Sequence, residues 1–213
     1  MKGRFLVLDG IDGCGKSTQI KHLKKWLPVS GLMPTEAKLV ITREPGGTEL
    51  GIALRELLLH DSQTQSPQSI TELMLYAADR AEHVAQIILP AIQQGDWVLS
   101  DRFSGSTIAY QGYGRKLDIE IIQQLEIIAT QGITPDITFW LDISLDESLN
   151  RRVMQKNDRI EAEGKDFLGN VLSGFQVLAQ ERKWVKIDAS NDPHQVSKDI
   201  EHNLRKELTN LPA

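Results

Sequence analysis

Short apolar runs alternate with longer amphipathic stretches along the whole chain. Each run is bounded by polar or turn-forming residues, which is typical of strands buried on both faces of a parallel sheet. The runs are Phe5 to Asp9, Leu39 to Thr42, Trp97 to Ser100, Ile137 to Leu141 and Trp184 to Ile187. Strands that alternate with helices predict an α/β fold in which parallel strands are joined by right-handed crossovers.

Two of the intervening stretches carry apolar residues at helical spacing, which predicts one buried stripe on each helix. The positions are Leu50, Leu54, Leu57 and Leu58 in the first stretch and Val196, Ile200, Leu204 and Leu208 in the second. Pro28 to Ala37, with two prolines and a glycine, predicts a surface loop. The charged segment from Gln155 to Lys165 predicts a flexible element that could close over a site.

Composition narrows the class of protein. The 213 residues are 40% hydrophobic and 25% charged, which is ordinary for a soluble globular chain, and they predict a single domain over residues 1–213. The net charge of -5 argues against nucleic acid as a partner, because polyanion binding needs surplus Lys and Arg. The single cysteine, Cys14, excludes an intramolecular disulfide and favours the cytoplasm. No segment is long and apolar enough for a signal peptide or membrane span, so no membrane partner is expected.

The segment Gly10 to Ser17 fits the phosphate-binding pattern G-x-x-x-x-G-K-[ST], with a predicted strand before it and an amphipathic helix after it. Glycines let several backbone N–H groups point at one anion, and the helix N-terminus adds its positive dipole end. Lys16 is expected to contact the β- and γ-phosphates of ATP, and Ser17 to bind Mg²⁺. A plain glycine-rich turn is the alternative, which this context disfavours. The predicted ATP-binding residues are Gly10, Ile11, Asp12, Gly13, Cys14, Gly15, Lys16, Ser17 and Thr18.

Two further segments bear on the phosphate acceptor. Arg43 follows a predicted strand and precedes a Pro-Gly-Gly turn, at the sheet edge where α/β proteins bind ligands. Tyr76, Arg80 and His83 lie at i, i+4 and i+7 of a predicted helix, so they share one face. Taken alone, a surface arginine and a core tyrosine explain these positions at least as well.

The third segment begins with the predicted strand at Trp97. Asp101 ends that strand, which is the usual place for a carboxylate that helps order the Mg²⁺ shell of a phosphate-binding loop. Arg102 is expected to point into the same cleft. Thr107, Tyr110 and Gln111 share a face of the next helix and offer a hydroxyl, a phenol and an amide to a base or sugar.

These segments resemble the thymidylate kinase family in the same order along the chain. Leu99 to Gln111 is similar to the family signature, and Thr42 to Thr48 is similar to its T-R-E-P-G-G-T segment. Leu75 to His83 resembles the base-binding helix, and Asp158 to Glu161 resembles the lid. The resemblance covers nearly the whole chain and reverses the preference for the ordinary interpretations. It implies an α/β P-loop NTPase fold with a five-stranded parallel sheet, an acceptor-binding region at roughly 43–111 and a mobile lid at roughly 151–165.

On the base side, the resemblance implies that Tyr76 stacks on the base and that Arg80 binds the thymine carbonyl edge. Thr107 and Gln111 lie where the family contacts the pyrimidine, and Tyr110 lies where it crowds the 2′ position to favour deoxyribose.

On the phosphate side, the resemblance places Asp12 near the sugar 3′-hydroxyl and the acceptor phosphate. Arg102 is expected to hold that phosphate, with help from Arg43 and Arg55. One branch of the family carries an arginine in the phosphate loop where this chain has Gly13, whereas the other supplies catalytic arginines from the lid. The available lid arginines are Arg151, Arg152 and Arg159, of which Arg152 and Arg159 are favoured as catalytic beside Lys16 and Arg102.

The resemblance implies a homodimeric enzyme that phosphorylates dTMP to dTDP with ATP and Mg²⁺, for dTTP synthesis. The attacking phosphate is mostly dianionic at neutral pH, so no general base is expected. Three alternatives stay open: a kinase for another nucleoside monophosphate, a deoxynucleoside kinase, and a P-loop nucleotide switch.

Overall fold

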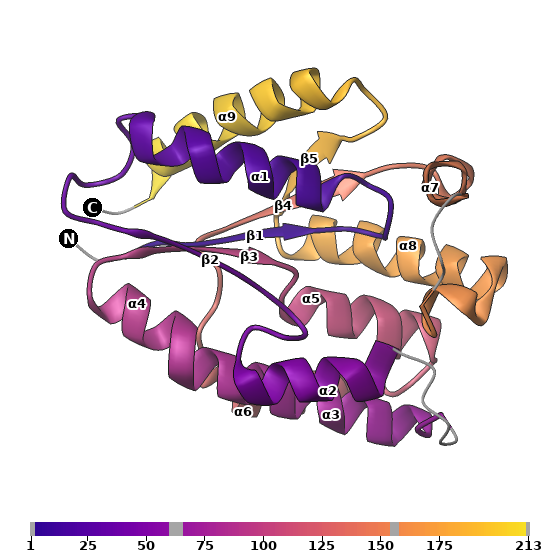
Figure 1. Ribbon diagram of the computed structural model, residues 1–213. Coiled ribbons are helices and arrows are strands. Elements are labelled where there is room, and N and C mark those ends of the chain that lie inside the picture. The colour runs from indigo at the N-terminus through magenta and orange to yellow at the C-terminus, as the bar shows by residue number, and fades with distance from the viewer. Residues whose placement is uncertain (1–2, 60–65, 154–157, 212–213) are drawn as a thin grey trace.

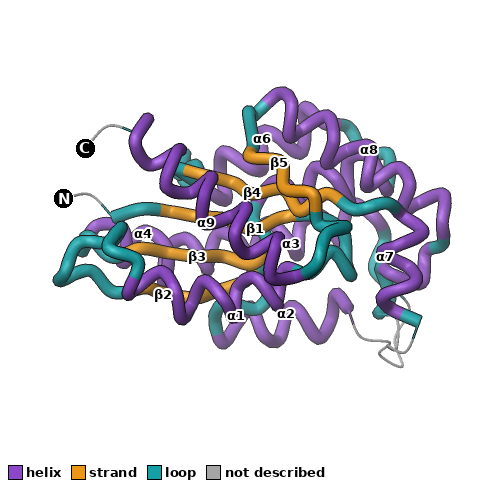
Figure 2. Tube along the Cα trace, turned by 90° about the horizontal axis from the view of Figure 1, so that it is seen from above, coloured by secondary structure: helices purple, strands orange, loops and turns teal. Residues whose placement is uncertain are grey.

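Five parallel strands form one sheet in the computed structural model, which describes residues 3–59, 66–153 and 158–211. The strand order is β2-β3-β1-β4-β5, as Figure 2 shows from above. The strands are β1 (Phe5–Asp9), β2 (Leu39–Arg43), β3 (Trp97–Asp101), β4 (Ile137–Asp142) and β5 (Val185–Asp188). This arrangement confirms the predicted α/β fold with five parallel strands.

Helices cover both faces of the sheet. The α-helices are α1 (Lys16–Trp26), α2 (Glu49–Leu59), α3 (Ser69–His83), α4 (Leu89–Gln93), α5 (Ser104–Thr107), α6 (Ile119–Thr130), α7 (Leu145–Arg152), α8 (Lys165–Glu181) and α9 (Pro193–Asn210). Two π-helical segments, η2 (Val84–Ile88) and η3 (Ile108–Gly114), continue α3 and α5, and two 3₁₀ turns are η1 (Leu27–Val29) and η4 (Glu161–Glu163). Helices α1 and α9 lie on one face, α2 to α6 and α8 lie on the other, and α7 lies beyond the carboxyl ends of the strands (Figure 1).

The sheet buries apolar side chains on both faces because successive strand residues point in opposite directions. In β1, Leu6 and Leu8 belong to the larger buried cluster, whereas Phe5 and Val7 belong to a smaller one on the opposite face. The central position of β1 between β3 and β4 therefore fixes the loop that follows it.

Strand register gathers the candidate chemistry at one edge. Leu8 of β1 is opposite Asp101 of β3, and Arg43 of β2 is opposite the same Asp101. The loop after β1 and the residues that end β2 and β3 therefore lie side by side at the carboxyl edge of the sheet, as the sequence pattern predicts.

The sequence-based strand predictions need two corrections. β2, β3, β4 and β5 each run one residue further, to Arg43, Asp101, Asp142 and Asp188, and β5 begins at Val185 rather than Trp184. Burial on both faces holds for β1, β3 and β4 but not for β2, which is half-buried, or for β5, which is partly exposed. The reason is position, because β2 and β5 are the two edge strands.

The predicted stripe on α2 is only half correct. Leu54 and Leu58 are buried, but Leu50 and Leu57 are 51% and 53% exposed, because α2 packs on α3 through a narrow face. The stripe on α9 is confirmed, since Val196, Ile200 and Leu204 are buried and Leu208 packs against them.

The predicted loop from Pro28 to Ala37 begins within the 3₁₀ turn η1 and is otherwise irregular, and about half of its residues are exposed while Leu32, Met33 and Ala37 pack against the core. Of the segment predicted as flexible, residues 155–157 lie outside the described part of the chain, and the rest contains η4 and the first residue of α8. No helix within the described ranges combines the length and apolar character needed to cross a bilayer.

Candidate active site

The phosphate-binding loop joins β1 to the N-terminus of α1. Gly13 and Gly15 have φ of 79° and 100°, a left-handed conformation that side chains disfavour, so glycine permits this turn. Lys16 is buried, and its Nζ donates to the carbonyl oxygens of Gly10 and Ile11 at 3.0 Å each. Cys14 is also buried, and burial raises the pKa of its thiol, which favours a small residue in a tight turn over a reactive thiol.

One carboxylate beside the loop is suited to a divalent cation. Asp101 Oδ1 is buried without a hydrogen-bond partner among the described residues, and Ser17 lines the same cavity. A buried oxygen without a partner costs free energy, so this arrangement fits the predicted metal pair of Ser17 and Asp101. Within the described ranges no group of three or more His, Cys, Asp or Glu side chains is arranged to hold a metal ion, so most other ligands would come from phosphate and water.

Arg102 is the side chain that ties the loop to the helix after β3. Its two terminal nitrogens donate to the Gly10 carbonyl oxygen at 2.8 Å and to Asp12 Oδ1 at 2.6 Å. Its guanidinium carbon also lies 5.2 Å from the ring centre of Tyr110. Burial raises the pKa of Asp12, but the charges of Arg102 and Lys16 outweigh burial and lower that pKa well below its usual range. Asp12 is therefore ionised and holds Arg102 at the mouth of the loop.

A second cavity lies beside the loop and contains most of the predicted acceptor residues. It is formed by α2, α3, η3 and the segment after residue 157. Its lining residues are Asp12, Glu44, Pro45, Arg55, Leu59, Tyr76, Arg80, Arg102, Phe103, Ser106, Thr107, Tyr110, Gln111, Asp158 and Ile160. This acceptor cavity brings together Tyr76, Arg80, Thr107, Tyr110 and Gln111, which the sequence predicted to share a base-binding site.

Arg80 is fixed inside the acceptor cavity by buried partners. Its Nε donates to Glu44 Oε2 and its Nη2 to Thr107 Oγ1, both at 2.9 Å. His83, predicted on the same helix face, lies behind this pair and contacts Glu44 Oε1 at 2.8 Å and Thr42 Oγ1 at 2.6 Å. His83 thus braces Glu44 and is not part of the cavity lining.

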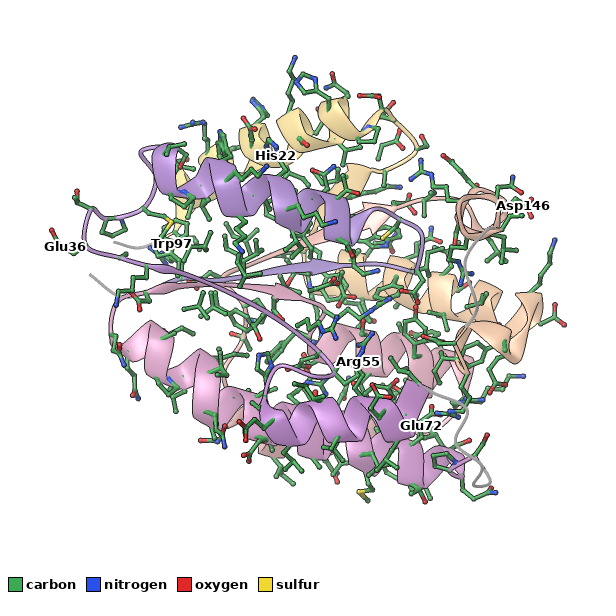
Figure 3. The ribbon with its side chains drawn as sticks, in the orientation of Figure 1. His22, Glu36, Arg55, Glu72, Trp97 and Asp146 are labelled. Atoms are coloured by element: carbon green, nitrogen blue, oxygen red, sulfur yellow. The ribbon has the colours of Figure 1, made fainter. Side chains whose placement is uncertain are left out.

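The acceptor cavity and the cavity around the phosphate loop meet at a shared wall. The residues that line both are Asp12, Glu44, Arg55 and Arg102. Figure 3 shows Arg55 between α2 and the sheet. Arg43 lines the loop cavity but not the acceptor cavity, and its help in holding the acceptor phosphate stays a prediction. Burial and the neighbouring charge of Arg43 lower the pKa of Arg55, so two cations are concentrated where an anion would relieve their repulsion.

The predicted lid arginines occupy different places. Arg152 is buried and lines the loop cavity, and a Cβ added at Gly13 would lie 3.2 Å from its Cγ. Arg151 lines the same cavity and donates to Glu147 Oε1 at 2.6 Å and to the Ala189 carbonyl oxygen at 2.9 Å. Arg159 instead donates to Glu72 Oε2 at 2.5 Å and to the Leu58 carbonyl oxygen at 2.8 Å, on the acceptor side.

Sequence reasoning missed two buried carboxylates of this site. Glu44 lies inside the T-R-E-P-G-G-T segment. It directly follows Arg43 at a strand end, and this position could have identified it as a site residue. Glu72 precedes Tyr76 by one helical turn, so helical spacing puts it on the recognised face. Both act as partners of arginines that the sequence did identify, Arg80 and Arg159.

Comparison with known proteins agrees with this geometry. The family model described as thymidylate kinase matches residues 8–200. A thymidylate kinase of Prochlorococcus marinus (strain MIT 9313) is 63% identical over 205 residues, covering 96% of this chain and 95% of the relative. A thymidylate kinase of Synechococcus sp. (strain CC9902) is 60% identical over 208 residues, covering 98% of this chain and the whole relative.

The fold matches as well. The crystal structure of thymidylate kinase from Ehrlichia chaffeensis superposes with a TM-score of 0.77 at 32% identity, covering 96% of this chain and 100% of that one. The family model, these identities and this structural similarity show that the chain belongs to the thymidylate kinase family.

Proposed function

We propose that the chain transfers the γ-phosphoryl group of ATP to the phosphate of dTMP, giving dTDP and ADP. The observation that carries the proposal is the shared wall between the two cavities. A triphosphate on the loop and a monophosphate in the acceptor cavity would meet beside Arg55 and Arg102, which line both spaces. The 63% identity to a protein named thymidylate kinase supports the choice of acceptor.

Recognition of the base is assigned to the far end of the acceptor cavity. Tyr76 offers a ring face for stacking, and burial is the main reason that the pKa of its phenol is raised, so the ring stays neutral. Arg80 is held on Glu44 and Thr107 with its guanidinium in the cavity wall, where it would donate to a pyrimidine carbonyl. Tyr110 donates to Asp12 Oδ2 at 3.1 Å, which supports the assignment of its ring to the sugar of the acceptor.

The chemistry follows from charge. An oxygen of the acceptor phosphate attacks the γ-phosphorus, and the bond from that phosphorus to the β-γ bridging oxygen breaks. The acceptor oxygen is already ionised, so the site needs cations rather than a base. Lys16, Arg102 and the lid-side Arg152 line the cavity in which these groups would meet. They would offset the repulsion between two polyanions and stabilise charge on the transferred group.

Ser17 and Asp101 are the residues that would hold Mg²⁺ with the triphosphate. When bound, the ion supplies charge neutralisation on the phosphate oxygens. The partnerless Asp101 Oδ1 supports this assignment.

Among the lid arginines, the geometry favours Arg152 over Arg159 as the one that reaches the transferred phosphoryl group. Arg152 packs over Gly13, so it would clash with a side chain at that position of the loop. Arg152 therefore lies beside Gly13, the loop position at which the other branch of the family has an arginine. Arg159 is committed to Glu72 and is better placed to shape the acceptor cavity.

The test is an acceptor panel. Purified protein with ATP and Mg²⁺ is offered dTMP, dUMP, dCMP, dGMP, AMP and thymidine, and the diphosphate or monophosphate products are quantified. Preferential formation of dTDP supports the proposal. Turnover of thymidine without turnover of dTMP would show a deoxynucleoside kinase instead. Slow ATP hydrolysis that no acceptor stimulates would favour a nucleotide switch.

We further propose that the chain forms a homodimer through α2, α3 and α6. Helix α3 packs on both α2 and α6, and each of the three helices exposes apolar side chains that include a pair at helical spacing. The pairs are Leu50 and Leu57, Ile70 and Met74, and Ile121 and Ile128. An exposed apolar patch of this kind is typical of an interface. Light scattering of the purified protein tests it, and Ile128→Glu is expected to give monomers while Val29→Glu, an equally exposed control on η1, leaves the dimer intact.

A further inference from the structure

Glu72 is a fully buried carboxylate that the proposed chemistry does not use. It lies on α3 one turn before Tyr76, with 0% of its surface exposed, and stands behind the lining of the acceptor cavity. Figure 3 shows it at the end of α3 that faces the acceptor side. Burying an ionised carboxylate is costly, so the fold must repay it with specific partners.

Three side chains donate hydrogen bonds to Glu72. Gln111 and Arg115 come from η3 and the residue after it, and Arg159 comes from the segment after residue 157. Its Oε1 accepts from Gln111 Nε2 at 2.9 Å and from Arg115 Nε at 3.2 Å. Its Oε2 accepts from Arg115 Nη2 at 3.1 Å and from Arg159 Nη2 at 2.5 Å. Burial raises the pKa of Glu72, but hydrogen bonds from Arg115, Gln111 and Arg159 outweigh burial and lower it below the usual value. Glu72 is therefore an acceptor on both oxygens.

Because both oxygens of Glu72 accept hydrogen bonds, the orientation of the Gln111 amide is fixed. An ionised carboxylate has no proton to donate, so only the NH₂ end of the amide can face Glu72. Gln111 is 2% exposed, and it also lines the acceptor cavity. With its nitrogen committed to Glu72, the side chain has its carbonyl oxygen left to offer a ligand in that cavity. The amide is then a hydrogen-bond acceptor and not a donor.

The polarity of this amide distinguishes two kinds of pyrimidine. Thymine and uracil carry an imide N–H between two carbonyl groups, which is a donor that an amide oxygen can accept. Cytosine has an unprotonated ring nitrogen at the same place, so two acceptors would face each other. Arg80, which only donates, adds the same preference because it matches a ring carbonyl and opposes an amino group.

We propose that Glu72 is a positioning residue that sets base selectivity by holding the Gln111 amide in one orientation. The inference rests on the proposed function, since it concerns the base of the same acceptor. Through Arg159 the same carboxylate also fixes the segment that carries Asp158 and Ile160, two further residues of the cavity wall. Glu72 thus links base reading to residues 158–160 of the predicted lid.

The test is Glu72→Gln, which preserves shape but can present either an oxygen or an NH₂ group to Gln111. We expect the ratio of kcat/KM for dTMP to kcat/KM for dCMP to fall about tenfold or more, since one buried hydrogen bond of the wrong polarity costs this much. Partial unfolding does not move this ratio, because the folded fraction multiplies both values equally. Asp136→Asn is the matched control, because it disturbs the hydrogen-bonded ion pair with Arg4 directly before β4, away from the acceptor cavity, and should leave the ratio unchanged.

Two further variants separate a positioning role from a purely structural one. If Glu72 acts through Gln111, then adding Glu72→Gln to Gln111→Leu changes the ratio no further. If Glu72→Gln does not fold, Glu72→Gln with Arg159→Gln removes one positive and one negative charge together, and the ratio is measured on that protein. An unchanged ratio in a variant that still phosphorylates dTMP overturns the inference and leaves the proposed function standing. Failure of the unmodified protein to use dTMP overturns the proposed function itself.

Discussion

The acceptor cavity and the phosphate-loop cavity share a wall but are built by opposite means. In the acceptor cavity, buried side chains hold one another: Arg80 is fixed by Glu44, and Gln111 by Glu72. In the loop cavity, one contiguous stretch, residues 12–19, forms one side, and separate charged side chains such as Arg102 and Arg152 line the rest. The difference teaches that a phosphate can be bound by backbone N–H groups of any sequence with the right turn, whereas reading a base needs side chains fixed in advance.

The largest effect is expected where the two regions join. Arg102→Ala removes the cation that lines both cavities, so kcat/KM should fall about 10³-fold or more, as for loss of a phosphate clamp. Steady-state kinetics with dTMP and ATP measures this, and circular dichroism checks that the fold survives. Arg182→Ala is the control, since Arg182 also pairs with a carboxylate, that of Glu126, but lines neither cavity. A kcat/KM equal to that of the unmodified protein would remove Arg102 from its assigned role.

Arg80 is expected both to bind the base of dTMP and to stabilise the fold through its ion pair with Glu44. Arg80→Gln leaves Glu44 buried without its cation, so the free energy of unfolding should fall by about 3 kcal/mol and the KM for dTMP should rise, with little change in the KM for ATP. Urea unfolding and initial-rate kinetics measure the two effects. Adding Glu44→Gln should restore most of the stability but not the affinity for dTMP. If the double variant regains both, Arg80 is only structural.

Burial of the Asp79 carboxylate also lowers the stability of the folded protein, by less than the loss of the Arg80 ion pair would. Its Oδ1 accepts from the Gly46 N–H at 3.0 Å, and burial together with the charge of Glu44 raises its pKa from 3.8 to about 6. A folded-state pKa above the unfolded value means that the folded protein binds more protons between these values, so stability falls as pH rises from about 4 through 6. Asp79→Asn should therefore flatten this pH dependence and stabilise the protein at pH 8 by roughly 1–3 kcal/mol.

The measurement is thermal unfolding of both proteins from about pH 4 to pH 8. Asp118→Asn is the matched control, because Asp118 is an exposed helix cap whose replacement by asparagine still accepts from the Glu120 N–H. Equal slopes for Asp79→Asn and the unmodified protein would mean that Asp79 has no raised pKa.

Much of this arrangement could be predicted from sequence because its signals are local. The loop from Gly10 to Ser17 is contiguous, and the parallel strands that end in Arg43 and Asp101 place those residues at one edge. Glu72 could not be predicted in its role, because its partners Gln111 and Arg159 lie 39 and 87 residues away. The exposure of Leu50 and Leu57 escaped prediction for a related reason, since helical spacing defines a stripe but not how much of it a neighbouring helix covers.

The smallest effect is expected on the loop side, where Arg151 is a partly exposed arginine beside Arg152. Its ion pair with Glu147 spans one helical turn at the surface, and such pairs contribute about 0.5 kcal/mol or less to stability. Arg151→Ala should therefore unfold at nearly the same urea concentration and raise the KM for ATP about twofold, through its lost contact with the Ala189 carbonyl oxygen, with the KM for dTMP unchanged. Arg205→Ala, an exposed arginine that packs on Trp26, is the control for the loss of one positive charge. A large fall in kcat for Arg151→Ala would instead make Arg151, and not Arg152, the cation on the transferred phosphoryl group, and the loop side would then depend on side chains as much as the acceptor side does.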